Sequence, residues 1–207
     1  MRVAVMIYPD TEPIDLATLG VLSMARRVAP QITAYTVAAD AGVTRMANGL
    51  QVVADYSYED APVADVLIIT GDSGWQREAQ AERTLAYIRR AHHASAVAAV
   101  CTGGMILAAS GLLDGHSATT KCQVTAGEVS PLQLLGERHP LVQAVEARIV
   151  DCGRLFTGGG VTLCIDMTLY LIERFVGGDE ARETARILEY GAAYAANEAR
   201  LTRVQSS

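Results

Sequence analysis

The chain has 207 residues, of which 50% are hydrophobic and 19% charged, and its formal net charge is −6. This composition excludes a disordered chain, and the length fits one domain with a large core. Acidic residues outnumber basic ones by 23 to 17, and Lys121 is the only lysine, so we expect no nucleic-acid partner.

The amino terminus and the cysteines exclude further classes. No apolar run reaches the roughly 18 residues that a membrane span needs, so no membrane association is expected. The first apolar run meets Asp10 and Glu12 too early for a signal peptide, which predicts a cytoplasmic protein. The four cysteines show neither CxxC spacing nor a neighbouring histidine cluster, so we predict no metal site and no disulfide framework.

Apolar strands and helical patterns alternate through the first half of the chain. Strands are predicted at 3–7 and 32–38 with a helix at 15–28 between them, which is a βαβ opening. The elements that follow are a short strand or hairpin arm at 50–54, a strand at 66–70, a helix at 76–92 and a strand at 96–100. Strands that are apolar at every position belong in a parallel sheet with helices on both faces.

The second half continues without a linker or an internal repeat. The predicted elements are a helix up to 113, a short strand at 117–119, a helix at 123–135, a hairpin of 145–150 with 155–157, a long helix at 161–175 and a last helix at 179–197. We therefore predict a single domain over 1–207, of which 195–207 is a tail.

The most informative segment is 98–104, where an apolar strand ends at Cys101 and the chain turns at once into a helix. Such a turn holds the sulfur on a sharp bend, and Gly103 lets the neighbouring backbone come close. The first amides of the helix and its dipole favour a thiolate, so we predict that Cys101 is a nucleophile. For Cys122, Cys152 and Cys164 a structural role is the better interpretation.

Several segments are informative in combination. They are Tyr8-Pro9 with Ile14-Asp15-Leu16, the loop 69–74, the Cys101 turn, and 155–162 with Ile165-Asp166. Together they resemble the ThiJ/PfpI superfamily, and most closely its isonitrile hydratase branch and the amidotransferase-like domains fused to AraC-type regulators. The similarity runs from residue 1 to about residue 195. It implies an α/β fold of the flavodoxin-like three-layer type, no cofactor and a homodimer.

The resemblance also assigns roles to individual residues. Cys101 matches the family nucleophile, and Thr102 matches a threonine that the isonitrile hydratases use in catalysis. Asp15 matches the acidic residue of the first loop, which makes it a candidate acid/base, although an N-cap is the plainer interpretation. Gly71 matches an oxyanion-type backbone amide. The glycines at 158–160 are expected to pack closely at the wall of the site rather than to bind phosphate.

Two positions depart from the family pattern. Asp72 stands where a second glycine is common, so a carboxylate is added to the rim of the pocket. Lys121 follows Thr119-Thr120 where the hydratases commonly carry a His-Trp pair. Lys121 could bind an anionic substrate group, pair with Asp72, or lie solvated at the surface. These two residues are where we expect the specificity of this chain for its small-molecule substrate.

Three functions remain open from the sequence. The leading hypothesis is a cofactor-free hydro-lyase that adds water to an isonitrile to give an N-substituted formamide. The second is a binding or redox-sensing module whose exposed, low-pKa Cys101 thiol is oxidised. The third is a glyoxalase- or deglycase-type hydrolase, which the threonine in place of a histidine after Cys101 disfavours.

Overall fold

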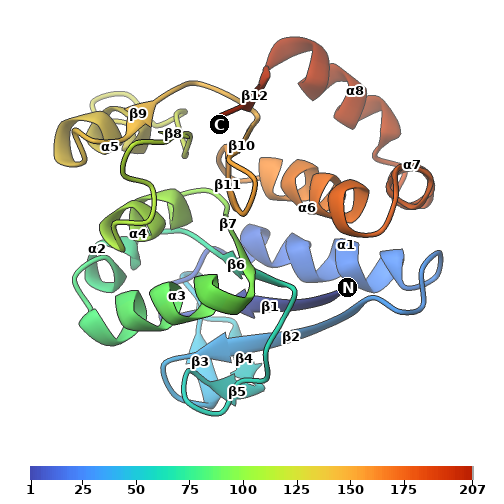
Figure 1. Cartoon of the computed structure of the whole chain (residues 1–207), viewed down its shortest axis with the longest axis horizontal. Helices are drawn as coiled ribbons and strands as arrows, with labels where there is room; N and C mark the ends of the chain where they lie inside the picture. The colour runs from blue at the N-terminus through green and yellow to red at the C-terminus, as the bar shows by residue number, and fades with distance from the viewer. Residues whose placement is uncertain (207) are drawn as a thin grey trace.

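The computed structural model describes residues 1–206, in which eight strands form one central sheet (Figure 1). Every neighbouring pair in this sheet is parallel except β10 with β11. The strands, in their order across the sheet, are β12 (Arg203–Gln205), β10 (Ile149–Asp151), β11 (Leu155–Gly158), β7 (Ala96–Ala99), β6 (Val66–Ile69), β1 (Arg2–Met6), β2 (Thr33–Ala38) and β5 (Tyr56–Ser57).

Helices cover both faces of the sheet, as the apolar strands predicted. Side chains of β1 alternate between two cores: Val3 and Val5 belong to one, Ala4 and Met6 to the other. The first core lies under α1 (Ala17–Ala25), α6 (Leu163–Phe175) and α7 (Gly178–Ile187), and the second under α3 (Glu82–Ala94) and α4 (Gly103–Ala109). The predicted three-layer α/β fold is therefore confirmed.

The predicted helices at 76–92 and 123–135 are wrong in detail. The first is divided into a short α2 (Trp75–Glu78) and α3. The second begins only at Pro131, where Ser130 caps α5 (Pro131–Arg138) and accepts the backbone N–H of Gln133 at 3.2 Å. Residues 121–130 form a loop instead, which turns at Gly127 with a φ of +91°.

The two ends of the chain also differ from the prediction. A 3₁₀ helix, η1 (Pro13–Leu16), precedes α1, which is shorter than the predicted 15–28. The predicted helix at 179–197 is two helices, α7 and α8 (Gly191–Arg200), because Glu189 has a φ of +54° between them. Residues 195–206 are more than a tail, since α8 leads to β12, which pairs with β10; Ser207 lies outside the described residues.

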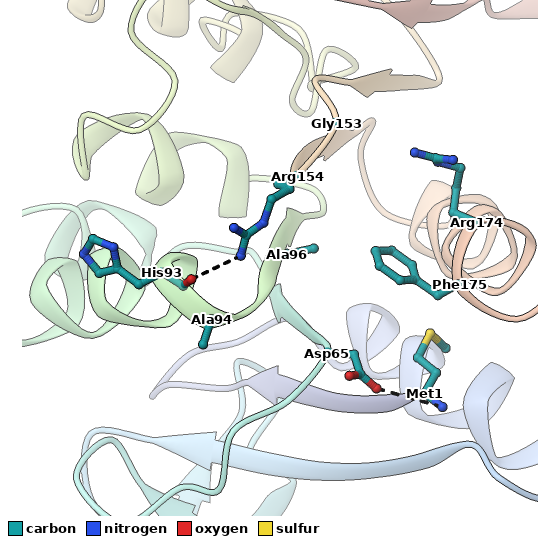
Figure 2. Close-up of a pocket in the computed structure, with 9 residues that line it drawn as sticks. All are labelled: Met1, Asp65, His93, Ala94, Ala96, Gly153, Arg154, Arg174 and Phe175. Carbon is teal, nitrogen blue, oxygen red and sulfur yellow. Dashed lines mark hydrogen bonds and ion pairs between the residues drawn. The ribbon is translucent and has the colours of Figure 1, made fainter.

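A cavity of about 620 Å³ lies where the parallel strands begin, among Met1, Asp65, Ala96 and the arginines Arg154 and Arg174 (Figure 2). Arg154 donates to the His92 carbonyl at 2.9 Å and so compensates the carboxyl end of α3. Asp65 pairs with the amino terminus, and Arg174 pairs with Asp151. The cavity lies at the amino ends of the parallel strands, whereas Cys101 follows the carboxyl end of β7.

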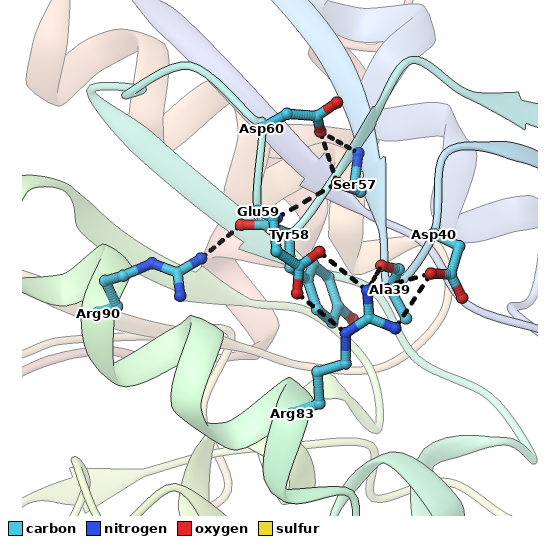
Figure 3. A network of polar contacts seen from close by, with 8 residues as sticks. All are labelled: Ala39, Asp40, Ser57, Tyr58, Glu59, Asp60, Arg83 and Arg90. Carbon is cyan, nitrogen blue, oxygen red and sulfur yellow. Dashed lines mark hydrogen bonds and ion pairs between the residues drawn. The ribbon is translucent and has the colours of Figure 1, made fainter.

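Arg83 of α3 connects this helix to the loops that follow β2 and β5 at one edge of the sheet. Its guanidinium forms ion pairs with Glu59 at 2.9 Å and Asp40 at 3.0 Å (Figure 3).

Two small pairs of strands lie outside the main sheet: the hairpin β3 (Gly42–Arg45) with β4 (Gln51–Ala54), and β8 (Ser117–Ala118) with β9 (Gln143–Ala144).

A buried ion pair holds α8 in place. Arg148, 1% exposed, lies 3.2 Å from Asp166 on α6, which is fully buried. Tyr190 and Asn197 donate to the other oxygen of Asp166 at 2.8 and 3.1 Å. The sequence motif Ile165-Asp166 thus has a structural role, because it connects α6 to the carboxyl-terminal helix. No helix within residues 1–206 is long and apolar enough to cross a membrane.

Candidate active site

Cys101 lies on a strained turn between the end of β7 and the start of α4. Its φ is +52°, a left-handed conformation that non-glycine residues rarely adopt. The turn is tight enough that a Cβ on Gly103 would lie 2.4 Å from the Ile69 carbonyl oxygen. Glycine is therefore required at 103, which agrees with the close approach predicted there.

The environment of the Cys101 sulfur differs from the expected one. The residue is only 3% exposed, and burial, assisted by the nearby Asp15 charge, raises the pKa of its thiol to about 12. The backbone amides of Val161 and Thr102 favour the thiolate and act in the opposite direction. The prediction of an exposed, low-pKa thiol is wrong, because desolvation outweighs the helix amides.

Asp15 belongs to η1 and is fully buried. Its Oδ2 accepts the Gly71 backbone N–H at 2.7 Å, whereas Oδ1 has no partner. Burial, together with the carboxylates of Glu12 and Asp72, raises its pKa to about 7 despite the opposing hydrogen bond from Gly71. Asp15 is no N-cap, since Glu12 caps η1. Its carboxyl makes no direct hydrogen bond to Cys101 within residues 1–206.

The loop after β6 packs directly on the nucleophile turn. A Cβ on Gly71 would lie 2.5 Å from the Thr102 backbone nitrogen and 2.9 Å from the Cys101 Cβ. The Gly71 amide, for which the family resemblance implied an oxyanion role, is occupied by Asp15 in this structure. It therefore positions the carboxyl group.

The Thr102 hydroxyl is bound to the same loop. Its Oγ1 accepts the Asp72 backbone N–H at 2.6 Å and donates to the Asp72 carbonyl oxygen at 3.2 Å. Asp72 has a φ of +132°, so an aspartate occupies a conformation that suits glycine better. Partial burial raises the pKa of Asp72, and the nearby Glu12 carboxyl raises it further.

Lys121 reaches the site from the loop before α5. Its stem lies against Gly160, where a Cβ would be 2.6 Å from the Lys121 Cγ. The Lys121 charge lowers the pKa of Asp15, Asp72 and Cys101, although burial raises each of them more. Within the described residues Lys121 forms no ion pair, so the pairing with Asp72 considered from the sequence is not seen.

Thr120 and Val161 contact Cys101 but were given no role from the sequence, whereas Gly159 was expected only to pack at the wall of the site. The Cys101 backbone N–H donates to the Gly159 carbonyl at 3.1 Å, and Thr120 donates to the Cys101 carbonyl at 2.6 Å. Val161, whose amide favours the Cys101 thiolate, has a strained φ of +53°. The run of three glycines before it was the available signal, since it marks a backbone that approaches another segment closely.

A cavity of about 390 Å³ adjoins this site, although Cys101 and Asp15 are buried behind its lining residues. Thr102, Asp72 and Lys121 line its inner part. The rest of the lining is mixed, with apolar Trp75, Val124, Val129, Pro131 and Leu134 beside polar Ser73, Gln76 and Glu128. The structure thus brings together all seven residues predicted for the site, Gly103 through its backbone. In residues 1–206 no three His, Cys, Asp or Glu side chains are grouped to hold a metal ion.

Comparison with known proteins places the fold and the site among relatives. A family model described as the DJ-1/PfpI family matches residues 1–174. An isonitrile hydratase of Pseudomonas putida is 34% identical over 194 residues, which are 93% of this chain and 80% of that protein. The HTH-type transcriptional regulator GbdR of Pseudomonas aeruginosa is 30% identical over 157 residues, 75% of this chain but 41% of the regulator. The crystal structure of a ThiJ/PfpI family protein from Pseudomonas syringae has a TM-score of 0.78 at 24% identity, and the match covers 91% of this chain and 74% of that one.

Proposed function

The chain belongs to the DJ-1/PfpI family, and on that premise we propose that it is a cysteine-dependent hydro-lyase that converts an isonitrile and water into an N-substituted formamide. One observation carries the proposal. Beside the predicted nucleophile lies a buried carboxyl group, Asp15, whose pKa is raised to about 7 and whose Oδ1 has no partner. A group that titrates near neutral pH can both accept and return a proton during one reaction.

In the first half of the proposed reaction, Asp15 enters as the carboxylate and Cys101 as the thiol. Asp15 takes the proton of the thiol, and the sulfur attacks the terminal carbon of the isonitrile. The same proton then passes from Asp15 to that carbon. The S–H bond is broken, a C–S and a C–H bond are formed, and the product is a thioimidate bound to Cys101.

In the second half, water attacks the thioimidate carbon. Asp15 removes one proton from the water and delivers it to the nitrogen, which leaves a tetrahedral intermediate. The C–S bond then breaks, and the remaining hydroxyl proton returns through Asp15 to the sulfur. The formamide leaves, and both groups regain their starting protonation.

The neighbouring residues position this pair in the proposal. The Gly71 amide keeps Oδ2 of Asp15 fixed, so Oδ1 is the oxygen that moves the proton. The Val161 and Thr102 amides favour the Cys101 thiolate as it forms. Thr102 holds the Asp72 peptide, and through it the loop that carries Gly71.

The direct test is hydration of cyclohexyl isocyanide by the purified protein, followed as formation of the N-substituted formamide. We expect turnover by the wild type, no turnover by Cys101→Ala, and at least about a hundredfold loss in Asp15→Asn. Full activity of Cys101→Ala, or an unchanged isocyanide with the wild type, would falsify the assignment.

A second candidate is a small-molecule-binding module without catalysis, which the similarity to a transcriptional regulator supports. The same assay separates the two, because a binding module leaves the isocyanide unchanged. Redox sensing at Cys101 is disfavoured by the burial and the raised pKa of the thiol. A hydrolase acting on small carbonyl compounds is tested by conversion of methylglyoxal to lactate.

The assembly and location are also proposals. We propose a cytoplasmic homodimer, as the family resemblance implies. Exposed valines on the hairpin support pairing of two copies, since Val43 is 66% exposed, Val53 is 61% exposed, and the two lie opposite each other in β3 and β4. Light scattering on the eluting protein measures the mass, and a monomeric mass counts against the dimer.

A further inference from the structure

Lys121 stands at the mouth of the proposed site with its stem fixed and its charge unpaired. The stem packs on Gly160, and a Cβ at 160 would come within 2.9 Å of the Lys121 Cβ and 2.6 Å of its Cγ. The side chain lines the cavity of about 390 Å³ together with Thr102 and Asp72. The base of the side chain is therefore held, and among the described residues that line this cavity Lys121 alone carries a positive charge.

The acidic groups around the same mouth are engaged, in contrast to Lys121. Glu128 is exposed and accepts the Thr125 backbone N–H at 3.2 Å, so it is bound to its own loop. Partial burial raises the pKa of Asp72, and the nearby negative charge of Glu12 raises it further. Within residues 1–206 none of these carboxylates lies within 4.0 Å of the Lys121 ammonium.

An unpaired cation in a cavity that also offers apolar side chains fits a substrate with an anionic end and a hydrocarbon part. We propose that the substrate of this chain is an isonitrile whose N-substituent ends in a carboxylate, and that the Lys121 ammonium binds this carboxylate. The hydrocarbon part of the substituent would lie on the wall formed by Trp75, Val129 and Leu134. This inference rests on the proposed hydratase function and assigns its substrate class.

The test uses isonitriles that share a skeleton and differ in charge. We would measure kcat/KM for 3-isocyanopropanoate, its methyl ester and 2-aminoethyl isocyanide. The wild type is expected to favour the acid over the ester by about tenfold or more, as a charge-assisted hydrogen bond provides. Lys121→Met should remove that preference mainly through KM, whereas Lys121→Arg should keep most of it.

Two controls separate binding from other effects. Arg186→Gln removes a positive charge that lies on α7 and pairs with Glu183, so it should leave the acid-to-ester ratio unchanged. A purely electrostatic role of Lys121 at Asp15 and Cys101 would slow the acid and the ester equally and shift the pH profile. Thermal melting of Lys121→Met shows that the variant is folded.

Each outcome decides a separate claim. Turnover of all three compounds without a preference for the acid, or with a preference for the amine, overturns the inference and leaves the hydratase function standing. An equal effect of Lys121→Met on acid and ester also overturns it. If none of the isonitriles is hydrated, the proposed function fails, and the substrate class falls with it.

Discussion

The Gly71 backbone amide holds Oδ2 of Asp15 at 2.7 Å and leaves Oδ1 of the same buried carboxyl group without a partner. Residues 56 positions apart in the sequence thus form one unit beside the Cys101 sulfur. The amide lowers the pKa of Asp15, but burial raises it more, and the result of about 7 falls in the range where the group can shuttle a proton.

The pH dependence of activity follows from this pKa. The pair of Asp15 and Cys101 must carry one negative charge to react, whichever of the two groups holds the remaining proton. Asp15 loses its proton near pH 7 and the Cys101 thiol only near 12. We expect kcat/KM to rise about tenfold per unit below pH 7 and to be level from there to pH 9. The measurement is an initial-rate profile from pH 5 to 9, and a flat profile would contradict it.

The ionisation of Asp15 should also affect stability: the free energy of unfolding should fall as the pH rises toward 7, whereas activity should rise. Folding raises the pKa of Asp15 from its ordinary 3.8 to about 7, so the folded state favours the protonated carboxyl. That stability is present below pH 4 and is lost as the pH rises through 7. Asn keeps the shape without the charge, so Asp15→Asn should be more stable than the wild type at pH 8, by about 4 kcal/mol at most.

Urea unfolding at pH 4, 6 and 8 measures this difference, which should shrink toward pH 4. Asp114→Asn changes an exposed carboxylate and serves as the control, for which the stability relative to the wild type should not depend on pH in this way. An Asp15→Asn variant that is less stable than the wild type at pH 8 would show that the carboxylate is better accommodated than its burial indicates.

Much of the fold could be predicted from the sequence because the signal is local. Strands such as β6 and β7 are apolar at every position, which occurs when helices cover both faces of a parallel sheet. Residues 123–130 form a loop, although they belong to the helix predicted at 123–135. The cap at Ser130 and the turn at Gly127 decide against it, and such signals depend on single residues.

The proximity of the candidate site residues could be predicted from the sequence, but their electrostatics could not. The turn at Cys101 and the glycines around it are visible as a strand that meets a helix without a linker. The raised pKa of the Cys101 thiol could not be predicted, because the helix amides are evident from the sequence whereas the depth of burial is not. The contact of Asp15 with Gly71 also depends on how two distant loops pack.

Gly71→Ala tests the packing of the loop on the nucleophile turn. The added Cβ would meet the Thr102 backbone nitrogen at 2.5 Å, so the loop must move away from Cys101. We expect a loss of stability of about 1–3 kcal/mol and a loss of activity, since Asp15 moves with the loop. Gly20→Ala is the matched control, because a Cβ there meets nothing within 4 Å on the exposed side of α1. It should gain up to about 1 kcal/mol and keep its activity.

Oxidation by peroxide tests the sensing hypothesis. Thiolates react and thiols do not, so the buried Cys101 with its pKa of about 12 should be oxidised slowly at pH 7. Cys122 is half-buried at the rim of a cavity and should acquire oxygen earlier. Mass spectrometry of peptides after timed exposure measures both. Oxygen added first at Cys101 would revive the sensing function.

The buried ion pair of Arg148 and Asp166 predicts how strongly α8 is held. Replacing Arg148 by Met leaves the fully buried Asp166 carboxylate without its cation, so we expect a loss of about 3–5 kcal/mol in the free energy of unfolding. The double variant Arg148→Met/Asp166→Leu removes both charges and should recover much of this loss. Arg186→Ala breaks only an exposed pair with Glu183 and should have no measurable effect. Hydrogen exchange should show faster opening of α8 in Arg148→Met, because no residue of α8 is itself buried and Arg148 bonds Glu198 of α8 directly at 2.9 Å. Equal exchange of α8 in the variant and the wild type would mean that contacts such as the packing of Tyr194 on α6 and α7 hold the helix instead.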